Sequence, residues 1–151
     1  MTRTINQNGL QLIKQLEGFR GNYYNDQIGQ KTIGYGHCIQ YRGPIEPRYR
    51  VPLSESDASR LLREDLHLDE EFVQRVTNGR LNDNQFAACV SFSFNMGTEA
   101  FRGTQILTNI LAGNYAAAGQ AFGRYNSMQG QVLDDLTERR RQERQLFESR
   151  Y

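Results

Sequence analysis

The sequence predicts an α+β fold, with a small lobe that contains a β-hairpin and a larger lobe built of helices. Two observations predict it. Aromatic and β-branched residues flank a glycine-containing turn between residues 23 and 36, which is typical of a hairpin. Beyond residue 54, apolar residues recur at helical spacing in segments that glycines separate. We expect one domain, residues 1–151, with the β-containing lobe at about 13–55 and the helical lobe at about 56–151 together with the N-terminal residues.

A short amphipathic helix should precede the hairpin and end at Glu17 and Gly18. Its apolar residues recur at three- and four-residue spacings, namely Leu10, Leu12, Ile13 and Leu16. In the hairpin that follows, Asp26 lies at the start of the turn that contains Gly29, and Thr32 lies on the returning strand. We therefore expect Glu17, Asp26 and Thr32 on a helix end, a turn and a strand.

A loop and a series of helices should complete the chain. All three prolines fall between residues 41 and 52, which predicts a loop. Ser54, with Asp57 three residues later, resembles a capping box in front of a long helical pattern, and Asn78-Gly79 ends that pattern. Shorter helices are expected at about 84–95, 104–112 and 115–123, and a closing helix at about 133–148.

The composition excludes several classes of function. Charged residues make up 23% of the chain, and the mean hydropathy is −0.70. No apolar run approaches the roughly 20 residues that a membrane helix needs, so we expect no stable membrane association. The first eight residues lack the apolar region of a secretory signal. We therefore expect synthesis in the cytoplasm and, if the substrate is cell wall, delivery by another factor.

The charge distribution argues against nucleic-acid binding. The net charge is only +1, whereas broad nucleic-acid binding depends on many phosphate contacts. The basic run Arg139-Arg140-Arg141, with Arg144, is balanced by acidic residues between positions 131 and 151. We interpret this segment as a solvated helix with local ion pairs.

The cysteines and histidines do not form a metal-binding pattern. Cys38 and Cys89 are far apart in the sequence, and His37 and His67 are the only histidines. No Cys/His spacing typical of a metal site results, so we predict neither a metal nor a cofactor. One cysteine pair in a chain of this length does not require a disulfide, and we interpret both as buried free thiols.

Glu17 and Asp26 suggest a glycosidase site. Glycoside hydrolysis needs two carboxyl groups in different protonation states, one to protonate the leaving oxygen and one to activate water or attack the sugar. Isolated Glu/Asp pairs are common on protein surfaces. Here, however, five glycines between residues 18 and 36 allow close backbone approach to a ligand, and Tyr24 and Tyr35 offer flat faces suited to sugar rings.

Residues 12–37 resemble the catalytic region of the phage-type lysozymes, the glycoside hydrolase family 24 endolysins. The family pattern is Glu, eight residues, Asp, five residues, Thr, followed by Ile-Gly-x-Gly, and each element is present. Residues 81–97 resemble the family's central helix with its Phe-Asn-x-Gly ending, and residues 136–143 resemble its closing Leu-x-x-Arg-Arg-x-x-Glu helix. The chain departs from the family in having no tryptophan before the closing helix, where it offers Tyr125, and in Asp135, where relatives often have glycine.

The resemblance implies a lysozyme-like fold in which a long helix joins the two lobes and the saccharide lies in the cleft between them. It implies a muramidase that inverts configuration, with Glu17 as general acid, Asp26 as the residue that orients or deprotonates water, and Thr32 helping to position that water. His37 would make a structural ion pair, and Arg139 would approach the catalytic glutamate. Further candidates for substrate binding are Tyr24, Tyr35 and Asn95.

The expected substrate is the peptidoglycan glycan strand, and the family implies a delivery factor such as a holin and a monomeric protein. One alternative is a lytic transglycosylase on the same substrate, in which the muramyl 6-hydroxyl replaces water. Another is a non-catalytic wall-binding relative. A nucleic-acid-binding helical domain is the weakest of the alternatives.

Overall fold

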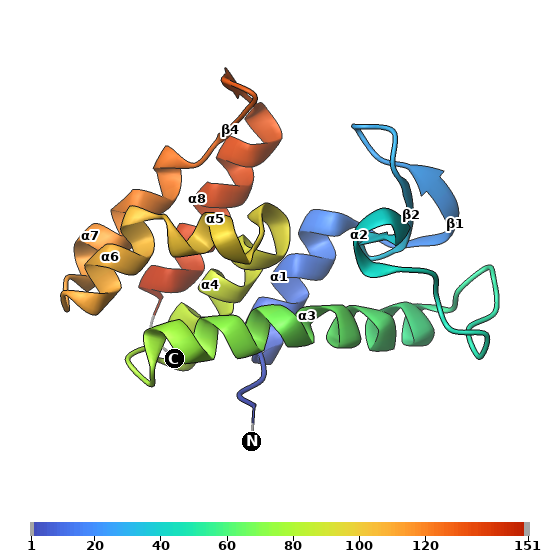
Figure 1. Ribbon diagram of the computed structural model, residues 1–151, viewed down its shortest axis with the longest axis horizontal. Helices are drawn as coiled ribbons and strands as arrows, with labels where there is room; N and C mark the ends of the chain where they lie inside the picture. Colours follow the sequence, from blue (N-terminus) through green and yellow to red (C-terminus); the bar gives the residue numbers. More distant parts are fainter. Residues whose placement is uncertain (1, 150–151) are drawn as a thin grey trace. The chain divides into compact units, whose positions relative to one another are not determined.

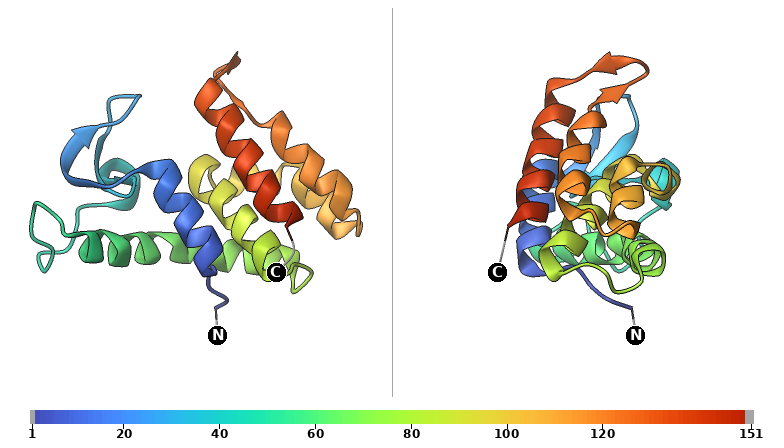
Figure 2. Two further views of the ribbon diagram at one scale, coloured as in Figure 1. Left: turned by 180° about the vertical axis from the view of Figure 1, so that it is seen from behind. Right: turned by 90° about the vertical axis from the view of Figure 1, so that its left-hand side faces the viewer.

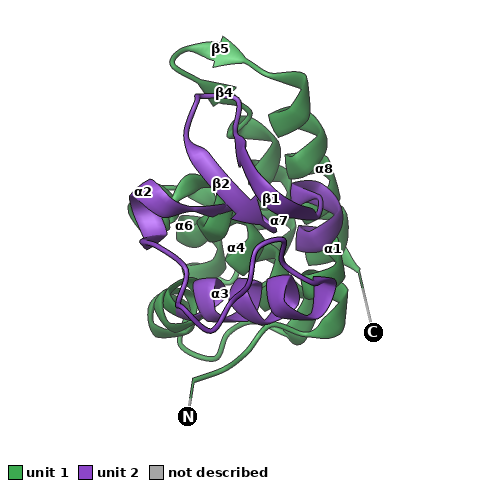
Figure 3. Cartoon of the chain, turned by 90° about the vertical axis from the view of Figure 1, so that its right-hand side faces the viewer, with its two compact units in different colours: residues 1–12, 68–151 green, residues 13–67 purple. Residues whose placement is uncertain are grey.

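A computed structural model describes residues 2–149 of the chain (Figure 1). The chain forms two compact units. Unit 2 is Ile13–His67, and unit 1 combines Met1–Leu12 with Leu68–Tyr151 (Figure 3). The boundaries fall inside two helices, α1 (Gln7–Glu17) and α3 (Glu55–Thr77), so each of these helices contributes residues to both units.

Unit 2 is built around a three-stranded antiparallel sheet in the order β1-β2-β3. Its strands are β1 (Arg20–Asn25), β2 (Lys31–Gly34) and β3 (His37–Cys38). Tyr24 lies opposite Thr32 in the register, and an irregularity separates this pair from Arg20 opposite Gly34. The predicted hairpin is therefore confirmed, with Asp26 directly after β1 and Thr32 on the returning strand.

The long helix α3 begins and ends where the sequence predicts. Ser54 Oγ accepts a hydrogen bond from the backbone N–H of Asp57 at 3.0 Å, which satisfies one of the free donors of the first turn. At the other end Asn78 and Gly79 have φ values of 47° and 76°, a left-handed conformation that stops the helix. Among the described residues, no helix is both long and apolar enough to cross a membrane.

Unit 1 is helical and is organised around α4 (Asp83–Met96), which packs against α8 (Asp134–Glu148). The remaining helices are α5 (Thr98–Arg102), α6 (Gln105–Leu111), α7 (Tyr115–Ala121) and the short 3-10 helix η1 (Phe122–Arg124). Figure 2 shows α8, in red, running beside α7, in orange, and the two are in contact. Phe92 of α4 lies at the centre of this core, with its ring 6.0 Å from that of Phe101 and 6.1 Å from that of Phe122.

Several short elements were not predicted. They are α2 (Ile39–Arg42), β3, α5 and the hairpin of β4 (Ser127–Met128) and β5 (Gln131–Val132). Each is too short to produce a hydrophobic period. The turn of the last hairpin places Gln129 and Gly130 at φ values of 53° and 79°. Asparagine or aspartate is the usual residue at the first of these positions, so a glutamine there hides the hairpin from a sequence pattern.

Candidate active site

Glu17 is the last residue of α1 and is half-buried. The helix stops directly after it, because Gly18 adopts a φ of 76° while its N–H still bonds to the carbonyl of Lys14 at 2.9 Å. The carboxyl group lies against the backbone of Gly36. A Cβ atom built on Gly36 would be 2.5 Å from Glu17 Oε1 and 2.9 Å from its Cδ. The helix end thus presents the carboxyl group to the segment that follows β2.

Asp26 and Thr32 are joined through the backbone of Gln30. Asp26 Oδ1 accepts hydrogen bonds from the N–H of Gln30 at 2.8 Å and from the N–H of Ile28 at 3.0 Å. The carbonyl of Gln30 accepts from the Thr32 hydroxyl at 2.9 Å and from the N–H of Asp26 at 2.9 Å. One peptide segment therefore fixes the Asp26 carboxylate by its N–H and the Thr32 hydroxyl by its carbonyl.

Tyr24 links Glu17 and Asp26 electrostatically. Burial raises the pKa of the Tyr24 phenol, and the negative charges of Glu17 and Asp26 raise it further, while Arg20 opposes them. The guanidinium of Arg20 lies 4.7 Å from the centre of the Tyr24 ring. Tyr24 therefore responds to the charges of both Glu17 and Asp26, and it lies opposite Thr32 in the sheet register.

Tyr35, a second candidate for substrate binding, is buried in unit 2. Its hydroxyl donates to Glu55 Oε2 at 2.8 Å. Burial, together with this hydrogen bond and the charge of Glu55, raises the pKa of Tyr35 to about 12. Glu55 Oε2 also accepts from Lys14 Nζ at 3.1 Å. Tyr35 therefore ties the segment after β2 to α1.

His37 forms a buried ion pair with Asp65 of α3. Its Nδ1 lies 2.8 Å from Asp65 Oδ2, and its Nε2 lies 2.8 Å from the carbonyl oxygen of Gly43. Both partner atoms accept hydrogen bonds only, so the imidazole carries a proton on each nitrogen and is charged. Burial lowers the pKa of His37, but the hydrogen bond and charge of Asp65 and the Gly43 carbonyl raise it above its ordinary value, with Arg42 opposing.

This ion pair predicts a stability that depends on pH. Because the pKa of His37 is higher in the folded than in the unfolded protein, the stabilisation is complete below the unfolded pKa of 6.5 and is lost as the pH rises through the folded value. We therefore expect His37→Asn to lower the free energy of unfolding more at about pH 6 than at about pH 9. Denaturant titrations of both proteins at the two pH values measure the difference. A pH-independent difference would contradict a charged His37.

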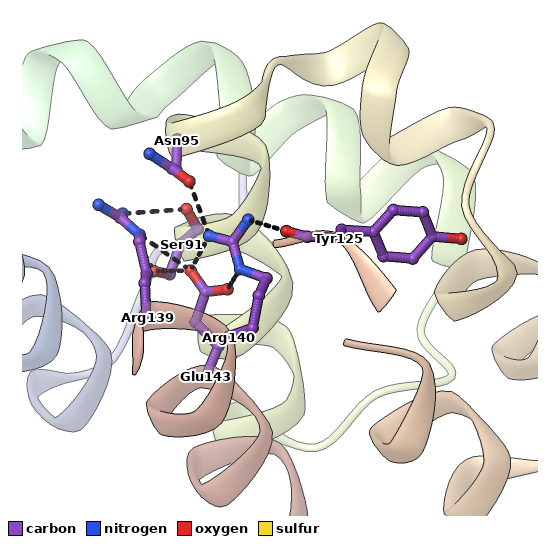
Figure 4. Close-up of polar contacts among 6 residues, drawn as sticks. All are labelled: Ser91, Asn95, Tyr125, Arg139, Arg140 and Glu143. Atoms are coloured by element: carbon purple, nitrogen blue, oxygen red, sulfur yellow. Dashed lines mark hydrogen bonds and ion pairs between the residues drawn. The ribbon is translucent and has the colours of Figure 1, made fainter. Parts of the chain in front are cut away.

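Arg139 and Asn95 belong to unit 1, whereas Glu17, Asp26 and Thr32 belong to unit 2. Arg139 and Asn95 are part of a polar cluster in unit 1 that we call the buried arginine cluster (Figure 4). Its members are Ser91, Asn95, Arg139, Arg140 and Glu143. Glu143 Oε2 accepts from Ser91 Oγ at 2.6 Å and from Arg139 Nε at 3.2 Å.

Arg140, which sequence reasoning missed, is buried in this cluster as deeply as Ser91 and Glu143. Its side chain is fully buried, and its Nε lies 2.7 Å from Glu143 Oε1. Its Nη2 donates to Asn95 Oδ1 at 2.7 Å, and its guanidinium lies 4.5 Å from the centre of the Phe92 ring. Asn95 is therefore oriented by Arg140. Burial lowers the pKa of Arg140, and the charge of Glu143 opposes this effect.

The interpretation of α8 as a solvated helix with local ion pairs is correct for only part of it. Arg141 with Glu138, and Arg144 with Glu148, form exposed pairs. It is wrong for Arg139, Arg140 and Glu143, which are buried. Spacings of three and four residues occur in both kinds of pair, so the spacing does not distinguish the buried from the exposed ones. The contact of α8 with α4 does.

The two cysteines, Cys38 and Cys89, are buried free thiols, as predicted. Burial raises the pKa of the Cys89 thiol well above its ordinary value, and the nearby charge of Glu143 adds to this. Within residues 2–149, no group of three or more His, Cys, Asp or Glu side chains is arranged to hold a metal ion.

Comparison with known proteins finds phage endolysins among the relatives of this chain. It is 37% identical over 143 residues to the endolysin of Salmonella phage P22, an alignment that covers 95% of this chain and 97% of that protein. It is also 37% identical over 145 residues to the endolysin of Bacillus phage B103. That alignment covers 95% of this chain and 53% of the B103 protein, so the chain spans about half the length of this relative.

Solved structures give the same result. A P22 lysozyme is 35% identical, with a TM-score of 0.84 over 97% of this chain and 99% of that one. The muramidase domain of SpmX from Asticaccaulis excentricus is 35% identical, with a TM-score of 0.83 over 98% of this chain and all of that domain. The family model described as phage lysozyme matches residues 14–143, from α1 to Glu143 of the buried arginine cluster. This chain belongs to the phage lysozyme family.

Proposed function

We propose that this chain is a peptidoglycan hydrolase of the endolysin type that cleaves the β-1,4 bond between N-acetylmuramic acid and N-acetylglucosamine. The observation that carries the proposal is the joint fixing of Asp26 and Thr32 by Gln30, beside a tyrosine whose pKa responds to both Asp26 and Glu17. The names of the relatives, an endolysin and a muramidase domain, support the same substrate class.

Glu17 is the proposed general acid. Its carboxylic acid form would donate a proton to the glycosidic oxygen while the bond from that oxygen to C1 of the muramic acid breaks. The oxygen then leaves as the 4-hydroxyl of N-acetylglucosamine. The half-buried position of Glu17 at the helix end limits the water that competes for this proton.

Asp26 and Thr32 are proposed to hold the attacking water. Two backbone N–H groups bond to Asp26 Oδ1, so we assign the other carboxylate oxygen to accept a proton from water. The Thr32 hydroxyl donates its hydrogen to Gln30, which leaves its oxygen to accept the second O–H of the same water. The water oxygen would then attack C1 opposite the leaving group, with inversion.

The main alternative is a lytic transglycosylase, in which the muramyl 6-hydroxyl attacks C1 and no water is needed. The coupling of Asp26 to Thr32 favours hydrolysis, since a transglycosylase needs no group that handles water. A non-catalytic wall-binding relative is the alternative from a different class, and the presence of Glu17, Asp26 and Thr32 on one unit disfavours it.

Analysis of the products of purified peptidoglycan tests the proposal. We expect new reducing muramic acid ends, with the α-anomer formed first, as mass spectrometry and time-resolved NMR would detect. Anhydromuramyl ends, which lack the mass of one water, would establish the transglycosylase instead. Binding to the glycan without new ends would establish a wall-binding protein.

Asp26→Asn separates the two proposed roles of this side chain, which are to hold the turn and to accept a proton from water. The amide oxygen can still accept from Gln30 and Ile28, so the turn is kept, while the group that takes the proton from water is lost. We expect kcat to fall by about 100-fold or more, with an unchanged Tm. Asp26→Ala is the comparison variant. It removes both the hydrogen bonds that hold the turn and the proton acceptor, so it should also lower Tm. Full activity of Asp26→Asn would rule out Asp26 as the base.

The same proposal covers partners and location. The endolysin relatives support action at the cell wall of a bacterial host. We propose that the protein acts as a monomer and that a further factor such as a holin gives it access to the wall. Analytical ultracentrifugation of the purified protein measures its mass in solution and so tests whether it is a monomer.

A further inference from the structure

Gly36 occupies a position where a side chain would collide with the carboxyl group of Glu17. An added Cβ would lie 2.5 Å from Oε1, 2.9 Å from Cδ and 3.4 Å from Cγ of Glu17. Separations below 3.0 Å are essentially never observed for real Cβ atoms. Any residue other than glycine at this position therefore requires that the Glu17 carboxyl group or the Gly36 backbone move.

The backbone around Gly36 is held on both sides. Tyr35, before it, donates its hydroxyl to Glu55, which in turn bonds to Lys14, one turn before Glu17 on α1. His37, after it, is fixed by Asp65 and by the carbonyl of Gly43. Because these neighbours are anchored, the collision should be relieved by rotation of the flexible Glu17 side chain.

Backbone conformation alone does not account for Gly36. Gly36 has a φ of 76°, which favours glycine, but Gly34 has a φ of 71° in the same Gly-x-Gly segment. A Cβ on Gly34 would meet Leu53, Ala58 and Leu61 at 3.5 to 3.8 Å, which are ordinary van der Waals contacts. The two glycines therefore share the conformational requirement, and only Gly36 adds the collision with Glu17.

We propose that Gly36 is a positioning residue for the acid: the absence of a side chain at residue 36 leaves the space in which the Glu17 carboxyl group is held for proton transfer. This inference rests on the proposed role of Glu17. Small displacements of a reacting group have large effects, since a misplacement of about 1 Å can cost about 100-fold in rate. Gly36 thus acts through Glu17 and touches no substrate in this proposal.

The test compares Gly36→Ala with Gly34→Ala, which carries the same backbone strain. We expect similar decreases in Tm for the two variants, because each places alanine at a positive φ. We expect kcat on peptidoglycan to fall by about 100-fold in Gly36→Ala relative to Gly34→Ala, with a much smaller change in KM. The alkaline limb of the pH profile of kcat, where a general acid loses its proton, should also shift in Gly36→Ala alone.

Equal kcat values and equal alkaline limbs of the pH profile in the two variants would overturn the proposal. If Gly36→Ala does not fold, the double variant Gly36→Ala/Glu17→Ala decides the matter. If the double variant folds, the collision with Glu17 is supported. If the double variant also fails to fold, the proposal is overturned. Glu17→Gln is measured alongside. If that variant keeps its activity, the proposed function fails; if it is inactive while Gly36→Ala is fully active, only this inference fails.

Discussion

Glu17→Gln is expected to lower kcat on peptidoglycan by about 10²–10⁴-fold while leaving Tm unchanged. Glutamine has the same shape as glutamate but no acidic proton, so the glycosidic oxygen would have to leave without protonation. The fold should tolerate the change, because Glu17 is the last residue of α1 and the helix is ended by the backbone conformation of Gly18. Turbidity loss of permeabilised cells and release of reducing ends measure the rate.

The matched control for this variant is Glu46→Gln. Glu46 also belongs to unit 2, and its side chain is 63% exposed in a pair with Arg48. The control therefore removes the same charge from the same unit without touching the site. Wild-type rates in Glu46→Gln and lost activity in Glu17→Gln are expected. If Glu17→Gln kept wild-type rates, the assignment of the acid would be wrong.

Glu143→Gln is expected to cause the largest loss of stability, about 3–5 kcal/mol in the free energy of unfolding. Glu143 is fully buried and is the carboxylate that Arg139 and Arg140 share. Replacing it leaves the fully buried Arg140 without its carboxylate partner, and burying an unpaired charge is far more costly than losing an exposed pair. Each kcal/mol corresponds to about 2–4 °C in Tm for a chain of this size.

The control is Glu138→Gln on the same helix. Glu138 pairs with Arg141 at the surface, with the same i,i+3 spacing as Glu143 and Arg140. Solvent and salt screen such a pair, so its removal should change the unfolding free energy little. Denaturant titrations at neutral pH compare the two variants. Equal effects would show that burial of the Glu143 carboxylate adds nothing to its contribution.

The sequence predicted the elements whose signals are local. The helix that ends at Glu17 follows from the spacing of Leu10, Ile13 and Leu16, and the start of α3 follows from Ser54, whose side chain bonds to the backbone as expected. The hairpin placed Asp26 and Thr32 correctly because turn and strand signals operate within a few residues. These are the parts that neighbouring residues determine.

The parts that were not predicted depend on contacts between distant segments. Arg140 and Glu143 look like surface residues in the sequence, and their burial depends on the packing of α8 against α4. The hydroxyl of Tyr35, a candidate for substrate binding, is bound to Glu55, twenty residues later. The close approach of the Glu17 carboxyl group to Gly36 likewise depends on where α1 places Glu17. None of these contacts has a period or a spacing that a sequence pattern can detect.

The link through Gln30 bears on how substitutions within this family should be compared. The atoms that hold Asp26 and Thr32 are a main-chain N–H and a main-chain carbonyl, which nineteen of the twenty amino acids supply equally at residue 30. The identity of this side chain can therefore drift during evolution without loss of the arrangement, and proline, which has no N–H, is the one exclusion. Residue 30 can thus vary in side chain among relatives while its backbone still holds both Asp26 and Thr32.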